Sequence, residues 1–292
     1  MLRCCRGGVP EPARARTPGA AATRHVNRQR TLALFAVAMA LGGSVARAQE
    51  PAEVARTFAQ GRVAYRLDGS VTVQPMAAAW PALKAMKPGS FRGAVVYLHG
   101  CDGINALSLN TADILAAENY LVLLPDSFAR LDKPRSCDPL EHRGGLHREV
   151  LAWRHAEADW ALKQTLSLPA VAADRLFLFG LSEGAIATAT YDGQALRGRV
   201  IEAWTCHAGW PEYRGLRASP EEAVLALTST NDPWYQDPAL RGDCGEALGP
   251  ATPSRRSVVF QPPHPAASHN DLMWNHEARG AVLDFLKRAS GR

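Results

Sequence analysis

One serine of this 292-residue chain stands in a setting that suits covalent catalysis. Ser182 is the centre of Gly180-Leu-Ser-Glu-Gly184, which follows the apolar run Leu176–Phe179 and precedes Ala-Ile-Ala-Thr-Ala. A strand, G-x-S-x-G and a helix in that order are typical of a sharp turn that holds a serine oxygen above a sheet, at a helix N-terminus. The motif predicts that Ser182 is a nucleophile. A tight turn with an incidental serine is the alternative.

A nucleophilic serine needs a base, and the base needs a carboxylate to orient it. When this turn carries the serine, the acid and then the histidine follow it along the chain. Asp232 follows the apolar run Ala223–Leu227, and two histidines follow Ser257–Phe260. We expect His269 to be the base, because His264 stands between prolines whereas His269 follows small residues. An ordinary Asp-Pro turn is the alternative for Asp232, and His264 is the alternative base.

Attack on a carbonyl group develops negative charge on its oxygen, and two backbone N–H groups should meet that charge. One belongs to the residue after the nucleophile, Glu183. The other is expected in His99-Gly-Cys-Asp-Gly103, where glycines let the backbone turn inward. We assign it to Cys101. A glycine-rich turn without this role is the alternative.

The elements that must position these residues alternate along the chain. Short apolar runs bounded by turn residues predict buried strands, with segments of helical spacing between most of them. The predicted strands are Ala94–Leu98, Tyr120–Leu124, Leu176–Phe179, Val200–Trp204, Ala223–Leu227 and Ser257–Phe260, and the predicted helices are Ser108–Glu118, Leu146–Leu166, Gly184–Tyr191 and Asn275–Arg288. This alternation predicts an α/β fold, a mostly parallel sheet with helices on both faces. Residues 60–75 add an antiparallel edge hairpin.

The motifs together resemble the dienelactone hydrolase family of the α/β-hydrolase fold, over roughly residues 90–290. The residues that carry the resemblance are Tyr97-Leu-His-Gly-Cys-Asp-Gly103, Pro125-Asp-Ser-Phe128, Gly180-Leu-Ser-Glu-Gly184, Asp232 and His269. The resemblance implies a compact hydrolase that cleaves small esters or lactones without a cofactor. The family's namesake enzymes carry cysteine where this chain has Ser182, which favours a more general carboxylic ester hydrolase.

Two other functions stay open. The stretch Ser268-His-Asn-Asp271 also resembles the histidine loop of prolyl-oligopeptidase-like hydrolases, so a peptidase or amidase is one alternative. A catalytically silent member of the fold that binds a ligand or a partner is the other. Only 28 positions separate Trp204 from Asp232, which leaves no room for a large helical lid. The cysteines and histidines fit no zinc or redox spacing, and no phosphate-binding glycine loop occurs, so we expect neither metal nor cofactor.

Four cysteines follow residue 48, an even number that fits disulfides in an exported protein. In the fold that the resemblance implies, Cys101 and Cys137 follow adjacent strands, and Cys206 and Cys244 follow another adjacent pair. We therefore expect the disulfides Cys101–Cys137 and Cys206–Cys244. Four buried thiols are the alternative.

The first 48 residues differ from the rest in charge, because they hold eight arginines and a single acid. The remainder has 25 basic and 27 acidic residues, which excludes a basic body that binds nucleic acid. Arg24–Arg30, the apolar run Thr31–Val45 and Ala46-Arg-Ala48 follow the order of a secretory signal peptide cleaved after Ala48, and the run is too short to span a membrane. We expect one domain over residues 49–292, in the periplasm or outside the cell.

Overall fold

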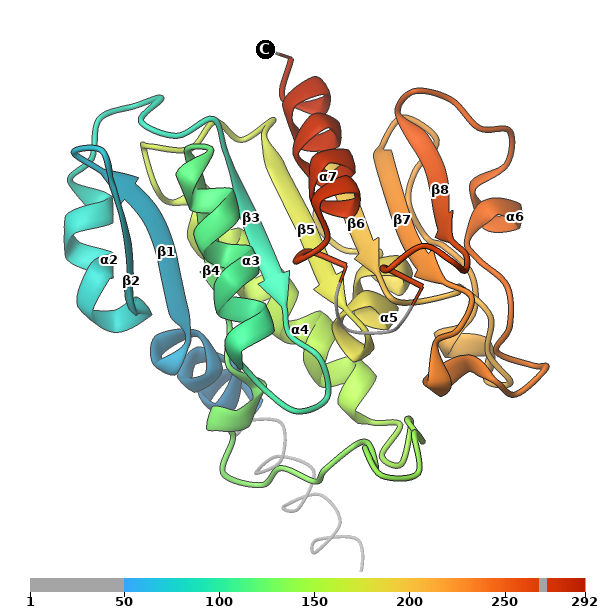
Figure 1. The fold of residues 1–292 in the computed structure, drawn as a ribbon. Coiled ribbons are helices and arrows are strands. Elements are labelled where there is room, and N and C mark those ends of the chain that lie inside the picture. Colours follow the sequence, from blue (N-terminus) through green and yellow to red (C-terminus); the bar gives the residue numbers. More distant parts are fainter. Residues whose placement is uncertain (1–49, 268–271, 292) are drawn as a thin grey trace, which may run out of the picture. The chain divides into compact units, whose positions relative to one another are not determined.

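The computed structural model describes residues 50–267 and 272–291 (Figure 1). Its strands are β1 (Arg62–Leu67), β2 (Ser70–Pro75), β3 (Gly93–Leu98), β4 (Tyr120–Leu124), β5 (Leu176–Leu181), β6 (Gly198–Glu202), β7 (Ala223–Ser229) and β8 (Arg255–Phe260). Its helices are one over residues 50–60, α2 (Met76–Lys84), α3 (Ala106–Ala117), α4 (Val150–Leu166), α5 (Glu183–Thr190), α6 (Gly245–Leu248) and α7 (His276–Ala289). The predicted leader, residues 1–48, lies outside the described residues.

The eight strands form one sheet in the order β2-β1-β4-β3-β5-β6-β7-β8. Strands β3 to β8 pair in parallel, whereas β1 pairs antiparallel with both β2 and β4. The predicted parallel sheet and its antiparallel edge hairpin are confirmed. Because the parallel strands run the same way, the loops after β3, β5, β6, β7 and β8 meet at one edge, where ligands bind in such sheets.

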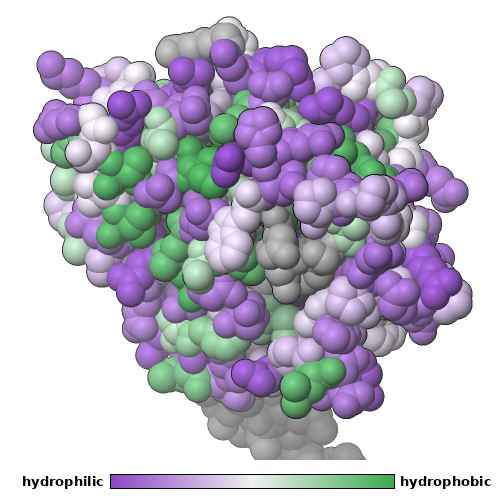
Figure 2. Space-filling model, in the orientation of Figure 1, coloured by the Kyte–Doolittle hydropathy of each residue, from purple (hydrophilic) through white to green (hydrophobic). Residues whose placement is uncertain are grey.

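Helices cover both faces of the sheet, with α3 and α7 on the near face in Figure 1 and α4 and α5 behind it. Alternation along β3 divides the core between these layers. Val95 and Tyr97 pack in the cluster that holds α3 and α7, whereas Ala94, Val96 and Leu98 pack in the cluster that holds α2, α4 and α5. On the near face, hydrophilic and hydrophobic side chains are interspersed (Figure 2).

The connection from β6 to β7 contains one short 3-10 turn, Pro211–Tyr213, and no lid helix among the residues described. The α/β-hydrolase architecture without a large lid is therefore the fold that the sequence predicts. No helix in the described ranges has the length and apolar character that a membrane crossing requires.

Two details of the prediction are wrong. The predicted strand Val200–Trp204 ends two residues early, at Glu202, because Ala203 adopts a left-handed backbone with φ 55°. The helices over 50–60 and Met76–Lys84 were not predicted, and Pro81 inside the second one reads as a helix breaker. That helix forms because one face of it, Met76, Ala79 and Leu83, is buried in the core.

Candidate active site

The turn around Ser182 has the strained geometry that the motif predicts. Ser182 links β5 to α5 with φ 54° and ψ −113°, a backbone that L residues rarely adopt. A Cβ at Gly180 would clash with the backbone of Gly184, and a Cβ at Gly184 would clash with the Leu98 carbonyl. The N–H of Ser182 donates to the Glu202 carbonyl at 2.9 Å, which ties the turn to β6. The strand, turn and helix predicted around the serine are confirmed.

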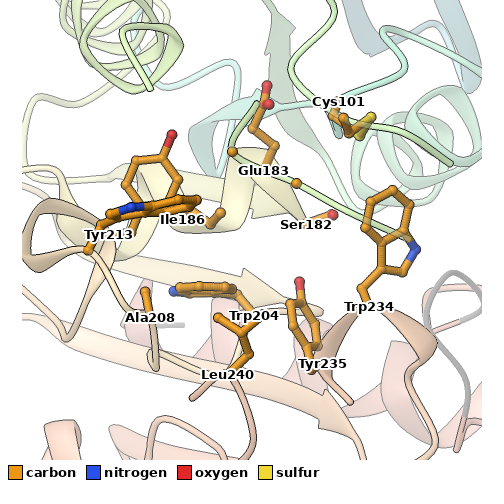
Figure 3. A pocket seen from close by; sticks show the side chains of 14 residues that line it. Cys101, Ser182, Glu183, Ile186, Trp204, Ala208, Tyr213, Trp234, Tyr235 and Leu240 are labelled. Carbon is orange, nitrogen blue, oxygen red and sulfur yellow. A yellow bond between two sulfur atoms is a disulfide. The ribbon is translucent and has the colours of Figure 1, made fainter. Parts of the chain in front are cut away.

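Tyr235 lies beside this serine, and no motif marks it (Figure 3). Its hydroxyl donates to the Ala203 carbonyl at 2.6 Å, and a side-chain hydrogen bond joins it to Ser182. Burial, reinforced by the nearby charge of Asp232, raises the pKa of Tyr235 well above its ordinary value. Tyr235 is therefore a neutral phenol that can orient the Ser182 hydroxyl.

Asp232 follows β7 and begins the 3-10 turn Pro233–Tyr235. Its side chain is buried, with 1% of the residue exposed, and its Oδ1 accepts a hydrogen bond from the Trp234 N–H at 2.9 Å. The Asp-Pro turn that the sequence left open is thus present. A carboxylate offers about four acceptor positions, so capping the turn leaves Asp232 able to orient a histidine.

The two candidate bases have different outcomes. His269 lies outside the described residues. In His264, Nδ1 accepts from the Ala266 N–H at 3.0 Å, Nε2 lies 3.0 Å from a Glu277 carboxylate oxygen, and the ring stacks on Phe260 at 4.8 Å. These contacts hold His264 against its own loop and α7.

His99, in the glycine-rich loop after β3, has a contact at each ring nitrogen. Its Nδ1 donates to the Gly100 carbonyl at 2.6 Å, and its Nε2 accepts from the Ser127 N–H at 3.2 Å. Burial, together with the Arg154 guanidinium, lowers the pKa of His99 well below its ordinary value. A neutral His99 therefore braces the loop that precedes Cys101.

The two expected oxyanion residues, Cys101 and Glu183, line one cavity together with Ser182. Glu183 is the first residue of α5, so its N–H has no acceptor within the helix. Two adjacent residues of one loop contact this pair. The Ser136 hydroxyl donates to the Glu183 carboxyl, and Cys137 forms a disulfide with Cys101. Ser136 carries no recognisable motif. Its contact with Glu183, next to the Cys137 disulfide, ties the two expected oxyanion residues to a single loop.

Both predicted disulfides are present. The Cα atoms of Cys101 and Cys137 are 6.0 Å apart, and those of Cys206 and Cys244 are 4.9 Å apart, within the range that a disulfide requires. The alternative of four buried thiols is therefore wrong. All four cysteines are buried.

Two glutamates near the serine have raised pKa values. Glu183 is only partly exposed, and the burial of its carboxyl raises its pKa against the opposing effects of Arg154 and Ser136. Burial raises the pKa of Glu202 to about 8, although the Met273 N–H stabilises its charged form. The Oε2 atom of Glu202 finds no hydrogen-bond partner among the described residues. Sequence reasoning identified neither side chain.

The cavity beside Ser182 is lined mostly by apolar and aromatic side chains (Figure 3). About 70 Å³ is open to the centres of water molecules. Its wall consists of Cys101, Cys137, Gly144, Gly145, Ser182, Glu183, Ile186, Trp204, Ala208, Trp210, Tyr213, Trp234, Tyr235 and Leu240. A second hollow, with about 90 Å³ open to the centres of water molecules, also reaches Ser182 and is lined by Gly100, Cys101, Asp102, Leu107, Pro139, Leu181 and Trp234. Ser182 thus lines both hollows.

Metal ligands do not gather in this part of the molecule. Within the described ranges, no group of three or more His, Cys, Asp or Glu side chains could hold a metal ion.

No family model matches the chain, and no curated protein matches it either. Similar solved structures include a dienelactone hydrolase-like promiscuous phosphotriesterase from metagenomic libraries (16% identity, 79% of this chain and 96% of that one, TM-score 0.49). A phospholipase/carboxylesterase from Dyadobacter fermentans shares 15% identity over 68% of this chain and 90% of its own, with a TM-score of 0.44. Esterase B from Lactobacillus rhamnosis shares 12% identity over 91% of this chain and 97% of its own, with a TM-score of 0.45. The function of this chain is therefore argued from its own site.

Proposed function

We propose that this protein is a serine hydrolase that cleaves carboxylic esters or lactones through an acyl-enzyme. The observation that carries the proposal is the backbone of Ser182. A non-glycine residue at φ 54°, at the start of α5 and beside a cavity, is held there by two glycines that no larger residue can replace without a clash. Strain of this kind is retained where a side chain must be presented to a substrate.

In the proposed reaction, the Ser182 oxygen attacks the carbonyl carbon while His269 takes the hydroxyl proton. Asp232 orients the histidine and stabilises its positive charge. The backbone N–H groups of Cys101 and Glu183 stabilise the tetrahedral oxyanion. The bond to the alcohol then breaks, and the alcohol leaves with the proton from His269. Water repeats the sequence on the acyl-enzyme and releases the acid and free Ser182.

The same proposal includes export. The leader over residues 1–48, with cleavage after Ala48, would deliver the domain of residues 49–292 to the periplasm or the medium. The two disulfides support this, because they form and persist in oxidising compartments.

Labelling with a fluorophosphonate probe tests the proposal on the purified mature chain. We expect covalent labelling and hydrolysis of p-nitrophenyl acetate, both lost in Ser182→Ala. His269→Ala should lower turnover by about 10⁴-fold, whereas His264→Ala should cost less than about tenfold. A chain that neither labels nor turns over any ester or amide would instead be a silent binding protein. Loss of activity only in His264→Ala would move the base to that residue.

A further inference from the structure

We propose that Trp210 limits the length of the substrate, and that the half of the ester held in the aromatic cavity is a short apolar group of a few carbon atoms. The inference rests on the proposed function and names the substrate class of the same site. It is carried by the size of the cavity, by the exposure of Trp210 and by the contacts that hold this indole against a second loop.

The cavity beside Ser182 is small and mostly apolar. About 70 Å³ is open to the centres of water molecules, whereas pockets for drug-sized ligands measure roughly 300–1,000 Å³. Ile186, Leu240 and five aromatic residues line it. The Glu183 carboxyl in the lining accepts a hydrogen bond from the Ser136 hydroxyl, and burial raises its pKa, which opposes a negative charge there. A short uncharged group therefore fits this space, whichever half of the ester it belongs to.

Trp210 is the most exposed of the five aromatic residues in this lining. It is 37% exposed, whereas Trp204, Tyr213 and Tyr235 are 2%, 6% and 9% exposed. In Figure 3, Tyr213 lies at the end of the lining away from Ser182. The Trp210 ring meets Tyr213 edge-on, with ring centres 5.3 Å apart. Trp210 thus forms the outer wall at this end, and removing the indole opens the cavity there.

A second loop closes on the same indole. Gly145, at φ 71°, lies so close to the Trp210 ring that a Cβ there would overlap it. The Arg148 guanidinium lies over the ring, 5.4 Å from its centre, and its Nε donates to a Glu212 carboxylate oxygen at 2.6 Å. Glu212 belongs to the turn Pro211–Tyr213, which directly follows Trp210. The loop that carries Gly145 and Arg148 therefore holds the indole across the end of the cavity.

This arrangement sets a limit on the length of the bound group. Each CH₂ that fits should raise kcat/KM by about fourfold, because burial of a methylene group is favourable. A longer chain must displace the Trp210 ring, which Gly145 and Arg148 hold in place, and overfilling a packed site is unfavourable. Turnover should therefore rise over the first few carbon atoms and then fall.

Chain-length profiles of the purified mature chain test this inference. One series varies the acyl group from p-nitrophenyl acetate to p-nitrophenyl octanoate, and the other varies the alcohol from ethyl acetate to octyl acetate. We expect kcat/KM to fall at least about tenfold from the four-carbon to the eight-carbon member of one series. Trp210→Ala should raise the eight-carbon to four-carbon ratio of that series by at least about tenfold and leave the other series unchanged. Trp80→Ala, the same change in α2 and in a different hollow, should alter neither profile.

Equal profiles in the unmodified chain and in Trp210→Ala, or the same shift in Trp80→Ala, would overturn the inference. Turnover that keeps rising to eight carbons in both series of the unmodified chain would also overturn it. Near-ultraviolet circular dichroism shows whether Trp210→Ala keeps its aromatic packing; if it does not, Trp210→Phe replaces it and should shift the same ratio in the same direction.

Titration calorimetry of the same esters on Ser182→Ala separates this inference from the hydrolase proposal. We expect affinity to fall beyond the four-carbon member of one series and the added change Trp210→Ala to remove that limit. This result without hydrolysis by the unmodified chain would keep the inference and reject the hydrolase. Affinity that is independent of Trp210 would reject the inference whether or not the chain is a hydrolase.

Discussion

The two disulfides close loops of nearly the same length but hold different parts of the site. Cys101 and Cys137 are 36 positions apart, and Cys206 and Cys244 are 38 apart. The first bridge ends on a residue whose backbone N–H is expected to meet the oxyanion. The second encloses Asp232 and packs below the cavity, with the Cys244 sulfur 3.5 Å from the Trp204 carbonyl. Two bridges of similar loop length therefore constrain different candidate groups of the site.

The difference lies in how each loop would act on the substrate. In the proposed mechanism, the 206–244 loop acts through one side chain, the Asp232 carboxylate. The 101–137 loop acts there through backbone geometry, because Cys137 is bonded to Cys101 and the neighbouring Ser136 holds the Glu183 carboxyl. A substitution at Cys101 or Glu183 leaves the backbone N–H of that residue in place. The 101–137 loop is therefore tested by changing the groups that hold it, the disulfide and Ser136.

The largest effect is expected from the acid of the 206–244 loop. Asp232→Asn should lower kcat for p-nitrophenyl acetate by about 10⁴-fold, because an amide favours the wrong histidine tautomer. Asp237→Asn, the same change at an exposed position of this loop, is the control and should leave kcat within twofold. Steady-state kinetics measure both. An Asp232→Asn enzyme with more than a tenth of normal kcat would show that Asp232 only caps its turn.

Removal of the two disulfides in turn should lower stability equally but should lower kcat in only one of the two proteins. Replacing either pair with serines should lower the free energy of unfolding by about 3–4 kcal/mol in the chain-entropy treatment, since the loops match in length. Only the Cys101→Ser/Cys137→Ser protein should also lose kcat, by roughly 10- to 100-fold, because a displaced oxyanion donor weakens binding of the transition state. Urea unfolding and steady-state kinetics on both proteins provide the measurements. Equal losses of kcat would mean that the bridges contribute only stability.

Loss of the Ser136 hydroxyl, which donates to the Glu183 carboxyl, should lower kcat by a still smaller factor. Ser136→Ala removes the hydrogen bond that holds the Glu183 carboxyl, and we expect kcat to fall about 3- to 10-fold with KM unchanged. We expect kcat to change and KM to stay the same because an oxyanion contact is made only in the transition state. Ser136→Thr keeps the hydroxyl and should restore most of the activity. A change in KM alone would place Ser136 in substrate binding instead.

The sequence predicts the parts of the site that depend on local chain geometry. Continuous apolar runs mark the parallel strands, and the glycines around Ser182 mark a turn whose backbone admits no larger neighbour. Ser136 and Tyr235 escape this reasoning because they reach the site only through tertiary contacts; Ser136 lies 47 positions from the glutamate it binds. The Pro81-containing helix escapes it because burial overrides a local breaker.

The last effect is on stability and not on kcat, and it concerns Glu202, at the end of β6 and four positions before Cys206. Burial raises its pKa from an ordinary 4.5 to about 8, so between these pH values the folded protein holds a proton that the unfolded chain has lost. Over that window the free energy of unfolding should decrease as pH rises, by at most about 1.4 kcal/mol per pH unit from this group, and the decrease should stop above pH 8. Glu202→Gln should flatten the slope, whereas Glu246→Gln, at an exposed position, should not. Urea unfolding at intervals from pH 5 to 9 measures it; identical slopes in the two variants would show that Glu202 ionises normally and that this end of the loop carries no buried proton.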